Sequence, residues 1–176
     1  MFEDFTLLGT PEKRIVVQTK LGNDLDAIIG PEPSQQCLNN FEVLRKRHGM
    51  HWIEIRKPPS GGYNCAGMVW AVRRAHLPQP ADWQLVLDDD GYRRIGQNEA
   101  KTGDIVVYVR NCDNEISHIG RICRMESLFS GSTEIGSPTP RVLSKWDVTS
   151  GECIHAISDV HLDGGEAVTP IVYTDR

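Results

Sequence analysis

The chain has 176 residues, enough for a single domain with its own hydrophobic core. It carries 19 basic and 24 acidic residues, a net charge of −5, and no basic cluster beyond the short "RKR" at 45–47. This balance disfavours nucleic acid as a partner, and the 39% hydrophobic and 24% charged residues are typical of a folded globular protein.

The sequence shows no segment that would enter or cross a membrane. Its N-terminus is acidic and lacks the basic start and apolar stretch of a secretory signal. No run approaches the roughly 20 apolar residues that span a bilayer. We therefore expect a cytoplasmic protein, or one that is exported without an N-terminal signal peptide, and no membrane partner.

The cysteines indicate reduced thiols. Their number, five, is odd, and no two of them form a C-x-x-C pair, so neither a disulfide framework nor a zinc site is indicated. We expect no metal and no cofactor. Four of the cysteines are predicted to be structural: Cys37, Cys112, Cys123 and Cys153.

Near the N-terminus, the chain predicts a strand followed by a helix. "RIVVQT" at 14–19 is rich in β-branched residues and predicts a short strand, which "GPEP" at 30–33 ends. Apolar residues then recur at helical spacing from Ser34, a favourable N-cap, to Gly49, a favourable helix end. This pattern predicts a helix over 34–49.

The next segment predicts a second helix with apolar residues on nearly all sides. An alternating stretch at 51–57 predicts a strand, and "PPSGGY" at 58–63 predicts a loop. The following residues predict a central, buried helix over 64–76, which Pro78 ends. Residues 80–96 combine a short predicted helix with a turn.

The second half of the chain predicts an antiparallel sheet. A turn and a β-branched run at 101–110 are followed by a hairpin turn and a returning strand at 116–125. Residues 126–140, rich in Ser, Thr, Gly and Pro, predict a long, functional loop. Further strands are predicted at 141–148, 151–158 and 167–175. Helices followed by a meander predict one domain of the α+β class, with N-terminal helices packed on an antiparallel sheet.

Cys65 is the candidate nucleophile. In "GGYNCAGMVWAVRRA", at 61–75, it stands where the second predicted helix begins, and a helix N-terminus lowers the pKa of a thiol. Gly61 and Gly62 would let the backbone approach a substrate and point amide N–H groups at a developing oxyanion. A single cysteine is more often a small buried residue, so the assignment needs further support.

That support is a resemblance over residues 60–158 to the NlpC-type branch of the papain-like cysteine peptidases and amidases. Those enzymes carry the nucleophile in "G-[FY]-[DN]-C-[SA]-G-[FM]", followed by "GD-[IL]-V", "H-[IV]-G" and often "[IV]-H-A". The matching segments here are, in the same order, Gly62–Met68, Gly103–Val106, His118–Gly120 and Ile154–Ala156. The resemblance implies a papain-like fold of the NlpC type.

The resemblance also implies the catalytic roles. Cys65 would attack a carbonyl, and His118 would act as the base. The third residue, which orients the base, is left open between His155, whose context matches, and Ser144, because a long stretch separates both from His118. We expect substrate contacts from Gly62, Tyr63, Ser144 and Trp146.

The implied activity is hydrolysis of amide bonds in a peptide or isopeptide, with peptidoglycan stem peptides the commonest substrates of such enzymes. One alternative is a binding module that has this fold without catalysis. Another is a thiol acyltransferase or deamidase effector. Nothing in the sequence indicates an oligomeric state.

Overall fold

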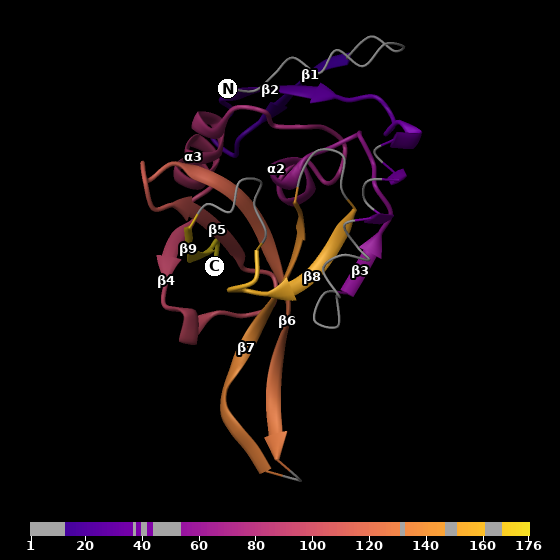
Figure 1. Ribbon diagram of the computed structural model, residues 1–176. Helices are drawn as coiled ribbons and strands as arrows, with labels where there is room; N and C mark the ends of the chain where they lie inside the picture. Colours follow the sequence, from indigo (N-terminus) through magenta and orange to yellow (C-terminus); the bar gives the residue numbers. More distant parts are fainter. Residues whose placement is uncertain are drawn as a thin grey trace.

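The computed structural model of the protein describes residues 13–36, 38–39, 42–43, 54–130, 133–146, 151–160 and 167–176 (Figure 1). Seven strands form one antiparallel sheet in the order β3-β8-β7-β6-β5-β9-β4, and β1 pairs with β2 in a separate hairpin. The strands are β1 (Lys13–Gln18), β2 (Asp24–Ile29), β3 (Glu54–Lys57), β4 (Arg93–Ile95), β5 (Ile105–Arg110), β6 (Ile116–Ser130), β7 (Thr133–Lys145), β8 (Glu152–Ala156) and β9 (Val168–Thr174). The helices are α2 (Cys65–Val69), α3 (Pro80–Asp89) and a short 3-10 helix, η1 (Gln97–Glu99).

The fold is mostly β, because 45% of its residues are in strands. Within the described residues, α2 and α3 are the α-helices whose two ends can be given. The expected α+β fold of the papain-like type, with N-terminal helices packed on the sheet, is therefore wrong. Within the helix expected over 34–49, the described positions 35, 36, 38, 39, 42 and 43 are helical. The rest of that segment lies outside the described residues.

The helix expected over 64–76 ends at Val69, so it is much shorter than predicted, and this contributes to the wrong fold class. Val72 and Arg73 have φ angles of 50° and 63°, in the left-handed region that a β-branched residue avoids and that ends a right-handed helix. The turn folds back onto α2, since a Cβ on Gly67 would lie 1.7 Å from the Ala75 carbonyl oxygen. The apolar pattern therefore reflects the burial of a short helix and most of its turn.

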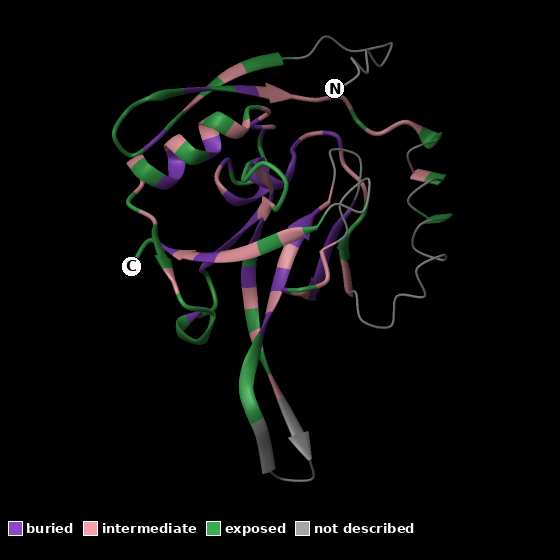
Figure 2. Cartoon of the chain, turned by 60° about the vertical axis from the view of Figure 1, so that its left-hand side comes forward, coloured by how far each residue is buried: buried purple, intermediate pink, exposed green. Residues whose placement is uncertain are grey.

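The long loop expected at 126–140 is also wrong, because most of this segment continues β6 and β7 as a two-stranded hairpin (Figure 1). Beyond Arg121 and Arg141 these strands pair only with each other. Register shifts after Ile122 and after Glu126 absorb the irregular residues, and the positions from Gly136 to Thr139 are exposed (Figure 2). Polar residues and prolines are tolerated here because both strands have a free edge.

The other predicted strands and α3 are found where expected. β1, β5, the first part of β6 and β9 confirm the strands predicted at 14–19, 101–110, 116–125 and 167–175. The described residues of the remaining predicted strands form β3, the last part of β7 and β8. Residues 51–53 and 147–150 lie outside the described residues. β2 and β4 were not predicted from the sequence.

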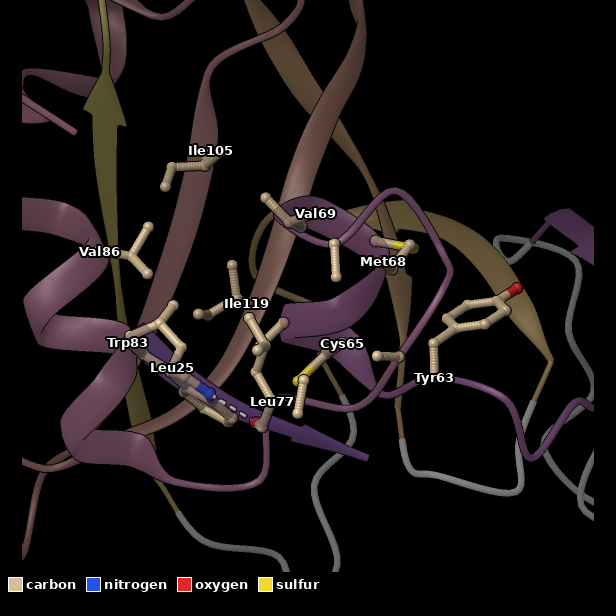
Figure 3. Packing of buried hydrophobic residues seen from close by; sticks show 14 of the residues in the cluster. Leu25, Tyr63, Cys65, Met68, Val69, Leu77, Trp83, Val86, Ile105 and Ile119 are labelled. Carbon is tan, nitrogen blue, oxygen red and sulfur yellow. Dashed lines mark hydrogen bonds between the residues drawn. The ribbon is translucent and has the colours of Figure 1, made fainter. Parts of the chain in front are cut away.

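The two faces of the seven-stranded sheet bury separate sets of side chains. On one face, Ile105 and Val107 of β5 pack with residues of α2 and α3 (Figure 3). On the other, Val106 and Tyr108 pack with Ile122 of β6. We call these the helix face and the far face. Because both are covered, β5 is a continuous apolar run instead of an alternating one.

Candidate functional site

Cys65 is the first residue of α2, and the side chain of Asn64 fixes the start of this helix. The Asn64 Oδ1 accepts hydrogen bonds from the backbone N–H groups of Gly67, at 2.8 Å, and Leu77, at 3.1 Å. Its Nδ2 donates to the Leu77 carbonyl at 2.9 Å. The helix start is thus tied to the segment that follows the turn, which positions Cys65 rigidly.

The Cys65 thiol lies on the helix face, next to Leu77 and Ile119 (Figure 3). The residue is 7% exposed, and burial raises the pKa of its thiol to about 11. The backbone of Ile119 and the charge of Lys145 both act in the opposite direction and lower this pKa. Burial outweighs them, so the thiol is protonated at neutral pH.

His118 lies on the far face of the sheet. Its neighbour Ile119 packs with Cys65, and successive side chains of a strand point to opposite faces. The His118 ring lies 5.5 Å from the ring of Tyr108, its cross-strand partner on β5. Burial, together with His155, lowers the pKa of His118 to about 3, and no described residue hydrogen-bonds its Nε2.

His155 and Ser144, the two candidates for the third catalytic residue, are hydrogen-bonded to each other on the far face. The His155 Nδ1 donates to the Ala156 carbonyl at 2.8 Å, which makes its Nε2 the acceptor for the Ser144 hydroxyl at 2.7 Å. The ring of Trp146 lies 5.7 Å from that of His155. Ser144 and His155 are both fully buried.

The structure therefore brings His118, His155, Ser144 and Trp146 together and leaves Cys65 on the other side of the sheet. Their expected catalytic roles stay predictions, but His118 and His155 lie on the face of the sheet opposite the Cys65 thiol. The alternation of β6 separates position 118 from position 119, and α2 covers the face of Ile119.

Gly61, Gly62 and Tyr63 have structural contacts on the segment before α2. A Cβ on Gly61 would lie 1.6 Å from the Pro31 carbonyl oxygen, so close packing requires glycine there. The Gly62 N–H donates to the Ser60 hydroxyl at 3.3 Å. The Tyr63 hydroxyl donates to Glu152 at 2.6 Å, inside a charged cluster on the helix face.

This charged cluster consists of Tyr63, Arg73, Lys145 and Glu152. The Arg73 guanidinium forms two hydrogen bonds to the Glu152 carboxylate, at 2.5 and 3.1 Å. Lys145 is the cross-strand partner of Glu152, and its Nζ lies 5.4 Å from the centre of the Tyr63 ring. Lys145 and Glu152 are each 1% exposed.

Glu152 keeps its negative charge although it is buried, because Arg73 and Tyr63 donate hydrogen bonds to its carboxylate. Burial raises the pKa of this carboxyl, but the hydrogen bonds from Arg73 and Tyr63 outweigh it and the pKa is lowered. The same hydrogen bond, with burial, raises the pKa of Tyr63. Sequence reasoning missed Arg73, Lys145 and Glu152. The available signal was the presence of Lys145 and Glu152 within two predicted strands, "RVLSKW" and "GECIHA".

The four cysteines predicted to be structural occupy different environments. Cys153 is buried on the far face, where its thiol contacts the Ser144 carbonyl and its pKa is raised by burial to about 12. Cys123 is partly buried and Cys112 is exposed. Cys37 lies outside the described residues. None of these placements tests a catalytic role.

Within the described ranges, no group of three or more His, Cys, Asp or Glu side chains is arranged to hold a metal ion. No helix in the same ranges has the length and apolar character needed to cross a membrane. Comparison of the chain with protein-family models, with curated proteins and with solved structures found no match.

Proposed function

We propose that this protein hydrolyses amide bonds by acyl transfer to the thiol of Cys65. In this proposal the buried Lys145 donates a proton to the leaving amine and later takes one from the attacking water. The observation that carries the proposal is that Cys65 and Tyr63 pack in one cluster on the helix face, and the Lys145 Nζ lies 5.4 Å from the centre of the Tyr63 ring, so the thiol and the buried lysine share one side of the sheet. The motif resemblance around Cys65 supports the same class of reaction and suggests a peptide or isopeptide substrate.

The Cys65 thiol is protonated at rest, so the proposed reaction begins when it releases its proton to water and becomes a thiolate on the same face of the sheet as the Lys145 ammonium. A cationic neighbour favours the thiolate, which attacks the carbonyl carbon of the amide. The Lys145 ammonium gives its proton to the departing amine as the C–N bond breaks, which leaves a thioester on Cys65. Neutral Lys145 then takes a proton from the water that attacks the thioester, and the carboxylic acid leaves as the thiolate is restored.

Glu152 has a supporting role in this proposal. Its carboxylate is occupied by Arg73 and Tyr63, so it is not free to act as a base. Its negative charge lies on the strand next to Lys145, and the Lys145 Nζ lies 5.4 Å from the centre of the Tyr63 ring.

The test is incubation with a panel of peptides, isopeptides and purified peptidoglycan fragments, with the products read by mass spectrometry. We expect cleavage by the wild type and by Cys153→Ala, the matched control with a buried cysteine on the far face. Cys65→Ala should be inactive with an unchanged melting temperature. Equal activity in the wild type and in Cys65→Ala would show that the thiol is not the nucleophile.

A binding module without catalysis is the second candidate, and the burial of Cys65 is the observation that favours it. A thiol that is 7% exposed, with a pKa of about 11, is typical of a packed cysteine. The same panel separates the two functions. Binding of a panel member without any cleavage, unaffected by Cys65→Ala, would favour the binding module.

A further inference from the structure

An open hollow of about 450 Å³ lies at the β4 edge of the sheet, away from the residues discussed so far. In Figure 1, β4, β9 and the C-terminus meet at this edge. The hollow is lined by Arg93 and Ile95 of β4, Glu99 and Lys101 of the following segment, and Thr174 and Arg176 at the end of β9. Three separate parts of the chain thus contribute three cations and one carboxylate.

Arg176 is held in place by its neighbours. Its guanidinium donates to both oxygens of the buried Asp104 carboxylate, each at 2.7 Å, and its Nε donates to the Thr174 hydroxyl at 3.0 Å. The Asp104 charge is therefore balanced by Arg176. The result is a fixed wall on one side of the hollow, formed by the paired Arg176 and Asp104, with little side-chain entropy left to lose on binding.

Neither the Arg93 nor the Lys101 side chain is paired with an Asp or Glu side chain among the described residues. The Arg93 Nε donates to the Arg176 carbonyl at 3.2 Å, which leaves its terminal N–H groups available. No side-chain hydrogen bond or ion pair involves the Lys101 ammonium within the same part of the chain. The carboxylate of Glu99 accepts the backbone N–H of Gly96 at 3.1 Å, which directs that oxygen to the backbone.

The direction of the β4 side chains explains why the cations gather here. Arg93 is paired with Thr174 and Ile95 with Val172, so both point to the side of the strand that lines the hollow. Arg94, between them, points to the opposite side and does not line it. In a chain with a net charge of −5, this grouping of cations is a local exception.

We propose that this hollow binds a small, multiply charged oxyanion, carrying phosphate or carboxylate groups, through Arg93 and Lys101 against the fixed wall of Arg176. Guanidinium groups present paired N–H donors that fit such anions, and an ammonium adds a mobile point charge. A small anion suits the acidic chain better than a long polyanion, which the remaining surface would repel. This proposal is independent of the chemistry at Cys65.

The test is isothermal titration of the whole protein with pyrophosphate, inorganic phosphate and succinate, each at the same ionic strength. We expect saturable 1:1 binding of at least one probe, and the preferred probe distinguishes a phosphate ligand from a dicarboxylate. Arg93→Gln and Lys101→Gln should each weaken binding about ten- to a hundredfold, because each removes a charge-assisted hydrogen bond. Arg94→Gln, the matched control on the same strand, should change the affinity by less than about twofold.

Two results would overturn the proposal. One is the absence of saturable binding of all three probes to the wild type. The other is an equal loss in Arg94→Gln and Arg93→Gln, which would indicate general surface attraction. If Arg93→Gln lowers the melting temperature, its weaker binding could reflect unfolding. Lys101 is exposed, so Lys101→Gln should leave the fold intact and still tests the binding.

Discussion

The helix face and the far face of the sheet both bury polar groups, but a charged carboxylate is stabilised on the helix face and neutral side chains are favoured on the far face. On the helix face, Glu152 keeps its charge because Arg73 and Tyr63 satisfy it, and Lys145 lies on the neighbouring strand. On the far face, burial favours neutral forms, with the pKa of His118 lowered to about 3 and that of Tyr108 raised. Chemistry that needs a charged group in the core is therefore supported on the helix face.

The largest expected effect concerns Lys145. Lys145→Met should lower kcat/KM by about 10²- to 10⁴-fold, because it removes both the proton donor and the charge that favours the Cys65 thiolate. Lys13→Met, which removes an exposed lysine of β1, is the control and should leave kcat/KM unchanged. The measurement is the rate on the best peptide of the panel. Equal rates for Lys145→Met and the wild type would remove the proposed difference between the two faces.

Loss of the Glu152 charge should mainly lower stability. Glu152→Gln leaves Arg73 without its carboxylate and removes the negative charge on the strand next to the buried Lys145, and breaking a buried ion pair in this way costs about 3 kcal/mol of unfolding free energy. Urea unfolding measures this change. Glu54→Gln is the control, because the ion pairs of Glu54 with Arg56 and Arg124 are exposed and should contribute nothing measurable. Similar losses for the two variants would contradict the account.

Acid should destabilise the far face through His118. Its pKa is about 3 in the folded protein and 6.5 when unfolded, so the unfolded state binds more protons below pH 6.5. This stability is fully present above pH 6.5 and decreases by up to about 1.4 kcal/mol per pH unit as the pH falls toward 3. Urea unfolding of the wild type and His118→Leu between pH 7 and 4 tests this, and we expect a flatter dependence for the variant. Parallel curves would show that His118 is not buried in its neutral form.

The smallest expected effect is that of Ser144→Ala. It removes the hydroxyl that donates to His155 and should cost about 1 kcal/mol of unfolding free energy, with kcat/KM unchanged. Thermal and urea unfolding, with rates on the same peptide, check both parts. A lower kcat/KM at an unchanged free energy of unfolding would contradict this prediction and support the catalytic role considered for Ser144 in the sequence analysis.

Much of the sheet could be predicted from the sequence, because β-branched runs such as 105–110 favour strands wherever they pack. The hairpin formed by β6 and β7 could not, since Ser, Thr, Gly and Pro favour turns unless a cross-strand partner holds them. The turn at Val72 and Arg73 could not be predicted either, because its left-handed conformation goes with tertiary contacts, such as the close approach of Gly67 to Ala75 and the hydrogen bond from Arg73 to Glu152.

The candidate site shows a similar limit. Alternation along β7 already places Ser144 and Lys145 on opposite faces, and the same holds for His118 and Ile119 on β6. The sequence does not indicate which face of the sheet α2 packs on, because that depends on how the chain crosses the sheet. Once α2 covers the face of Ile119, Cys65 and Lys145 lie on the same face of the sheet, and His118 and His155 lie on the other.

The most direct test of this account is the pH dependence of Cys65 alkylation by iodoacetamide, followed by mass spectrometry in the wild type, His118→Asn and Lys145→Met. We predict that the rate rises about tenfold per pH unit toward the thiol pKa of about 11, unchanged in His118→Asn and slower in Lys145→Met. Rapid labelling of Cys65 at pH 6 that is lost in His118→Asn and kept in Lys145→Met would contradict the account, because it would make His118 the partner of the thiol.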